Sequence, residues 1–117
     1  MKAEDISFKH KWESTLDKLG EVLGKRPENL NVVLFYIGIQ ELGVVKPVFS
    51  KEEKQDLMHI AVCKLLSKLG YYELEHLDAD GWPHWKLVKA LPAFKLNEQE
   101  KLLQMQVIDY VETELGI

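Results

Sequence analysis

Residues Tyr71–Val88 read YYELEHLDADGWPHWKLV, and here the residue pattern of the chain changes from helical to alternating. Apolar and polar residues alternate before an Asp-Ala-Asp-Gly turn at residues 78–81, and an aromatic stretch follows it. This order predicts a β-hairpin with a three-residue loop. Two cross-strand pairs are expected, His76 opposite His84 and Glu75 opposite Trp85. Because an isolated two-stranded hairpin is marginal in water, it must pack against helices.

The sequence on both sides of this hairpin predicts helices, because apolar residues recur there every three or four positions. Ser50 and Glu53 have the spacing of a capping box, and Gly70 is a suitable C-terminal stop. Asn97 is expected to cap the last helix. The expected helices are Ile6–Leu23, Asn29–Leu42, a third running from Ser50 to Leu69, and Glu98–Leu115.

The second of these helices has an alternative. Val32–Ile37 is an unbroken apolar run with β-branched and aromatic residues, as in a buried strand. The length of the segment favours a helix, since strands average about 5–6 residues. The expected fold is mostly α, a small bundle of about four helices with one β-hairpin inserted before the last helix. The alternative is an α+β fold with residues 31–39 as a strand.

The composition places limits on the class of protein. The chain has 117 residues and a net charge of -4, which suits one domain over residues 1–117. No apolar run reaches the ~20 residues of a membrane span, and the N-terminus lacks the apolar region of a signal peptide. Cys63 is the single cysteine, which fits a reducing compartment, so we expect a cytoplasmic protein without a membrane partner.

Three polar residues of the third helix could form a metal or ligand site. Asp56, His59 and Cys63 are spaced three and four residues apart, which places them on one stripe. Carboxylate, imidazole and thiolate are all zinc ligands, and His76 or His84 could complete a tetrahedral site. The alternative is structural, because a free cysteine is commonly a small buried apolar side chain. On that interpretation the protein has no cofactor.

Glu41 closes the most apolar segment and is the third member of a candidate small-ligand site with Asp56 and His59. A carboxylate that is partly buried there needs a partner or a raised pKa. The alternative is a solvated helix end. The sequence contains no Gly-x-Ser-x-Gly, no phosphate-binding loop and no dinucleotide-binding glycine pattern, so we expect a protein that is not an enzyme. The alternative is an enzyme whose catalytic residues converge from distant positions in the sequence.

The hairpin carries aromatic residues of the kind that dominate protein interfaces. The candidate partner-binding residues are Tyr72, Trp82, His84 and Trp85. The same residues could instead cover the core. The favoured hypothesis is a protein-interaction or scaffold module that binds a partner through this aromatic surface, or binds a second copy of itself as a homodimer.

A helix followed by Leu69-Gly70-Tyr71-Tyr72-Glu73-Leu74 and a hairpin ending in Trp85-Lys86-Leu87-Val88 is similar in order to winged-helix DNA-binding domains. The resemblance covers Asn29 to Val88 and implies a DNA-binding regulator, with the helix in the major groove and the hairpin as the wing. The chain is acidic, however, and its one arginine is Arg26. Because base and phosphate contacts favour basic side chains, the composition disfavours nucleic acid as a partner.

Overall fold

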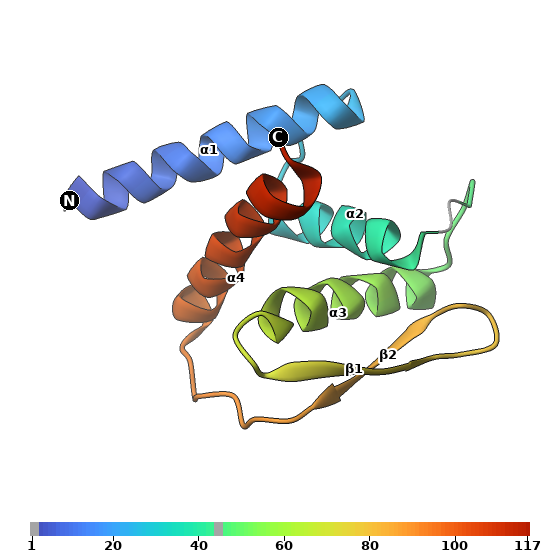
Figure 1. Ribbon diagram of the computed structural model, residues 1–117. Coiled ribbons are helices and arrows are strands. Elements are labelled where there is room, and N and C mark those ends of the chain that lie inside the picture. The colour runs from blue at the N-terminus through green and yellow to red at the C-terminus, as the bar shows by residue number, and fades with distance from the viewer. Residues whose placement is uncertain (1–2, 44–45) are drawn as a thin grey trace. The chain divides into compact units, whose positions relative to one another are not determined.

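The computed structural model describes residues 3–43 and 46–117. Over these residues the chain forms four α-helices and a two-stranded antiparallel hairpin placed before the last helix, which confirms the predicted fold class (Figure 1). The elements are α1 Ala3–Leu23, α2 Leu30–Leu42, α3 Lys51–Ser67, β1 Tyr72–Leu77, β2 Pro83–Leu87, α4 Leu96–Tyr110 and the π-helical turn η1 Val111–Leu115. No helix in the described part of the chain is both long and apolar enough to cross a membrane.

The chain divides into two compact units. One contains the residues up to Glu28 together with Phe94–Ile117, and the other contains Asn29–Ala93. The first unit comprises α1, α4 and η1, and the second comprises α2, α3 and the hairpin. A single folding domain over the whole chain is a statement about cooperative unfolding, so it stays a prediction.

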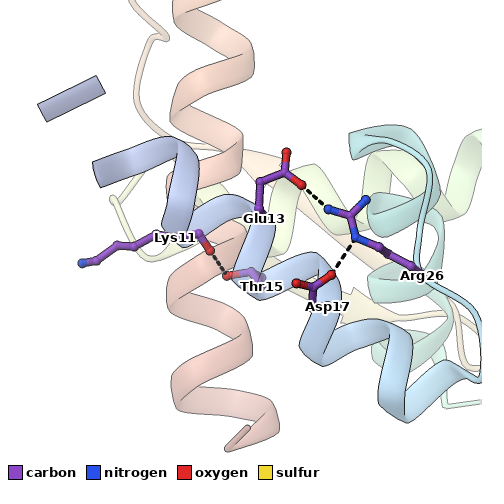
Figure 2. Close-up of polar contacts among 5 residues, drawn as sticks. All are labelled: Lys11, Glu13, Thr15, Asp17 and Arg26. Carbon is purple, nitrogen blue, oxygen red and sulfur yellow. Dashed lines mark hydrogen bonds and ion pairs between the residues drawn. The ribbon is translucent and has the colours of Figure 1, made fainter. Parts of the chain in front are cut away.

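In the first unit, the segment after α1 folds back onto that helix and is held by Arg26. The Arg26 guanidinium donates from Nε to Asp17 Oδ1 at 2.8 Å and from its Nη2 to Glu13, as Figure 2 shows. Its hydrogen bond to Asp17 is the main reason that the pKa of Arg26 is raised. Gly20 permits this return, because a Cβ there would lie 2.9 Å from Arg26 Cα. The single arginine of the chain therefore pairs with two carboxylates of α1.

In the second unit, residues 31–39 are helical, so the alternative strand over this segment is wrong. Asn29 caps α2, its Oδ1 accepting the Val32 amide at 3.1 Å, and Gly43 ends the helix with a φ of 74°. Val44 and Val45, which follow Gly43, lie outside the described residues. The apolar run is explained by close packing, because Gly38 lies against the Leu57 carbonyl of α3. The buried residues of α2 are Val33, Leu34, Ile37, Gly38 and Leu42.

The third helix begins as the capping box predicts. Ser50 Oγ accepts the Glu53 amide at 3.1 Å, and the Glu53 carboxylate accepts the Ser50 amide at 3.0 Å. The helix ends at Ser67, two residues before the expected end, and a turn with Gly70 at a φ of 84° leads into β1. Its core-facing residues are Leu57, Ile60, Ala61, Cys63, Leu65 and Leu66.

The hairpin has the predicted position, but half of its predicted register is wrong. His76 pairs with His84, as expected, whereas Trp85 pairs with Leu74 instead of Glu75. The register shifts between Leu74 and His76, which makes Glu75 the extra residue of a β-bulge. The sequence prediction assumed that side chains alternate strictly between the two faces of each strand. An extra residue on one strand breaks this two-residue period, so the sequence pattern did not indicate it.

The predicted cap of the last helix is also wrong. The helix α4 already includes Asn97, and its N-cap is Lys95, whose amide donates to the Glu98 carboxylate at 3.1 Å. Glu98 lies three residues after Lys95, and this reach of a glutamate back to the N-cap amide sets the start of the helix. The final turn η1 widens to a π-helix and ends at Gly116, which has a φ of 68°.

Candidate functional site

A pocket of about 330 Å³ lies between α3 and the turn end of the hairpin, within the second unit. Figure 1 shows the hairpin running beside α3. Eight residues line this α3–hairpin pocket: Asp56, His59, Ile60, Asp78, Trp82, Pro83, His84 and Trp85. Five of them are residues that the sequence singled out, and they come from both a predicted ligand site and a predicted partner surface.

The helix contributes the first wall. Asp56, His59 and Ile60 are three and four residues apart, so one side of α3 presents them together. Ile60 is buried, whereas Asp56 and His59 are exposed. The His59 ring meets the Tyr72 ring of β1 edge-on, with centroids 6.5 Å apart, and this contact ties the polar stripe of α3 to the first strand.

The Asp78 carboxylate organises the second wall. Its Oδ1 accepts the backbone amides of Asp80 at 2.9 Å and Trp82 at 3.0 Å, which closes the turn. Its Oδ2 lies 3.0 Å from His84 Nε2. The hydrogen bond with His84, followed by that from the Trp82 amide, lowers the pKa of Asp78, so this carboxylate stays ionised. His84 in turn stacks on His76 at 4.6 Å between ring centroids.

The two hairpin indoles are half-buried, so neither is sealed in the core. Trp82 packs against an apolar cluster formed by Leu42, Phe49, Leu57 and Ile60. Trp85 has a shielded Nε1 with no hydrogen-bond acceptor among the described groups. Each indole therefore has one side supported by the unit and lines the pocket with another part of its surface.

The hairpin also exposes apolar side chains. Cross-strand partners share one face of a ribbon, so the observed register places Tyr72, Leu74, Leu77, Pro83, Trp85 and Leu87 on one face. We call this set the hairpin apolar face. Leu74, Leu77 and Leu87 are 51%, 62% and 49% exposed. Glu73 and Lys86 form a pair on the opposite face.

Glu41, Cys63 and Tyr72 do not line the pocket. Glu41 lies 3.8 Å from Lys64 Nζ, so it is not brought together with Asp56 and His59 as a ligand site. Cys63 is buried, which raises the pKa of its thiol to about 11, and its Sγ lies 3.5 Å from His59 Nε2. Within residues 3–43 and 46–117, no group of three His, Cys, Asp or Glu side chains is arranged to hold a metal ion.

Sequence reasoning missed three lining residues, namely Ile60, Asp78 and Pro83. Asp78 had a usable signal, because an aspartate that opens an Asp-x-x-Gly turn commonly accepts amides two residues on. We assigned it to the turn alone, whereas its second oxygen reaches His84. Ile60 and Pro83 carried no comparable signal, since their place in the pocket depends on how the hairpin packs on α3.

No protein-family model, no curated protein and no solved structure matches this chain. The similarity to winged-helix domains therefore remains one of element order over α2, α3 and the hairpin.

Proposed function

We propose that this chain is a non-enzymatic protein-interaction module that binds another polypeptide through the hairpin apolar face and the adjoining α3–hairpin pocket. One observation carries the proposal. Three leucines of the hairpin stay about half exposed or more, although they share the face on which Tyr72 meets α3 and Trp85 lines the pocket. Apolar residues grouped on one face beside half-buried aromatic rings are typical of a binding surface. The single free thiol suits action in the cytoplasm.

The chemistry of the pocket supports a polypeptide over the other candidates. Its eight lining residues include two aspartates and neither lysine nor arginine, which disfavours contact with a phosphate backbone. They also include no serine, threonine, cysteine or lysine that could act as a nucleophile beside the His84–Asp78 pair. A winged-helix regulator and an enzyme are thus less well supported.

The proposal is tested by capture of partners from cells that normally make this protein. The interface variant is Leu74→Ser with Leu87→Ser, which removes apolar surface at half-exposed positions. Its matched control is Glu73→Ser with Lys86→Ser, a cross-strand pair on the opposite face. We expect wild type and control to retain the same partner, and the interface variant to bind the purified partner at least tenfold more weakly.

Sedimentation of the purified chain at several concentrations tests whether the partner is a second copy of the chain. A homodimer that the interface variant dissociates and the control variant preserves would support the proposal. A partner bound equally by both double variants would refute it. The proposal would also be refuted if the wild type is monomeric and captures only the proteins that the interface variant captures. Far-UV circular dichroism of each variant establishes that the fold is intact.

A further inference from the structure

Two carboxylates and two imidazoles line the α3–hairpin pocket. Asp56 and Asp78 contribute carboxylates to its lining, and no lysine or arginine side chain is among the lining residues. The pKa of Asp78 is lowered, chiefly by its hydrogen bond with His84, so its charge is fixed in place by the turn. Asp56 is exposed and enters none of the described hydrogen bonds or ion pairs. The Asp78 carboxylate is thus held in place by the turn, and the Asp56 carboxylate can pair with a bound group.

Two indoles lie beside these carboxylates. Trp82 and Trp85 both line the pocket, and both are half-buried. An aromatic face attracts a cation within about 6 Å of its centroid, and tryptophan does so best. Carboxylates next to indoles are the combination that recognises a positively charged group, whereas either feature alone would be ambiguous.

We propose that the α3–hairpin pocket receives a basic side chain, an arginine in the first place, from the partner polypeptide. This inference rests on the proposed protein-binding function and specifies the chemistry of its partner. The volume of about 330 Å³ is at the lower end of ligand pockets and suits one long side chain better than a large cofactor. Arginine is favoured over lysine because its planar guanidinium stacks on an indole while it also pairs with a carboxylate.

The other occupants fit less well. An anion would meet two carboxylates and neither lysine nor arginine among the lining residues. A metal ion lacks a suitable group of three ligands in the described part of the chain. A purely apolar side chain would leave the Asp56 carboxylate desolvated and unpaired, which is unfavourable.

The test is an NMR titration of the full chain with the peptide Ac-Gly-Arg-Gly-NH2. The comparison peptide carries citrulline, which keeps the shape of arginine and removes its charge. We expect saturable shifts of the Trp82 and Trp85 indole N–H signals, with an affinity for the arginine peptide at least fivefold higher than for citrulline. A lysine peptide should bind more weakly than the arginine peptide.

Two charge-removing variants of α3 locate the effect. Asp56→Asn should weaken arginine binding at least threefold and leave citrulline binding unchanged. Glu52→Gln removes another exposed carboxylate of the same helix that does not line the pocket, and it should change neither. Equal binding of arginine and citrulline peptides, or equal effects of the two variants, would overturn the inference.

The two proposals fail separately. If the peptide result is negative while partner capture still depends on Leu74 and Leu87, the binding module stands and its preference for a basic side chain is wrong. If the peptide binds as expected while capture is indifferent to those leucines, the pocket is a site for basic groups and the protein-binding function is wrong.

Discussion

Gly38 sets the distance between two helices by lacking a side chain. A Cβ at this position would lie 2.1 Å from the Leu57 carbonyl oxygen and 2.6 Å from its carbon. The clash is with the backbone, so no side-chain rotation can relieve it. We expect Gly38→Ala to lower the free energy of unfolding by about 3 kcal/mol, measured by urea denaturation. Asn31→Ala, at an exposed position of the same helix, should change it by less than about 1 kcal/mol. Similar values for the two variants would contradict this packing.

Cys63 is predicted to be inert in the folded protein. Burial raises the pKa of its thiol from an ordinary value of 9.0 to about 11. Alkylation by iodoacetamide at pH 8 should therefore be slower than in the unfolded chain by about 100-fold from the loss of thiolate alone. The folded state holds this proton more tightly, so the stability it contributes is complete below pH 9 and is lost as the pH rises toward 11. Equal alkylation rates in the folded and unfolded chain would refute the prediction.

At the residue scale, the sequence singled out five of the eight residues that line the pocket. Asp56, His59, Trp82, His84 and Trp85 were all identified, although for two different sites. They line one pocket because the hairpin packs on α3. No spacing within the sequence predicts that contact, because it depends on the tertiary packing of the two elements. The sequence pattern grouped Glu41 with Asp56 and His59, whereas the structure places it beside Lys64 and outside the pocket. Its partner Lys64 lies on another helix, and no local spacing relates the two.

Local signals were reliable at the scale of the element. The capping box at Ser50 and the glycines that end α2 and follow α3 act through neighbours within a few residues, so sequence spacing alone identifies them. The β-bulge was not predictable in this way. Ring contacts lie toward both ends of the hairpin. His76 stacks on His84 at the turn end, and Tyr72 meets His59 at the other end. The extra residue Glu75 lies between them.

The helix start at Ser50 offers a direct test of this local control. Ser50→Ala removes the hydroxyl that accepts the Glu53 amide and should reduce stability by about 1 kcal/mol. Lys51→Ala is the neighbouring control, since its side chain takes no part in the capping box. Thermal or urea unfolding of both variants measures the difference. A loss in the control equal to that in Ser50→Ala would show that the cap contributes nothing specific.

For the whole molecule, the open question is cooperativity between the two units. The tryptophans report on them separately, because Trp12 belongs to one unit and Trp82 and Trp85 to the other. Trp12→Phe leaves only the hairpin indoles, and Trp82→Phe with Trp85→Phe leaves only Trp12. The single-domain prediction requires the fluorescence transition of each variant to coincide with its own far-UV circular dichroism transition. A separate fluorescence transition in either variant would establish two folding domains.

The central claim is that one face of the hairpin binds another polypeptide, and photo-crosslinking from neighbouring positions of β2 tests it most directly. Leu87 belongs to the hairpin apolar face, and Lys86 points to the opposite side of the ribbon. With p-benzoylphenylalanine at each position in turn, we predict a defined crosslinked product from residue 87, to a partner or to a second copy, and none from residue 86. Crosslinking that is as strong from residue 86, or absent from both positions in cells that make the protein, would contradict the account.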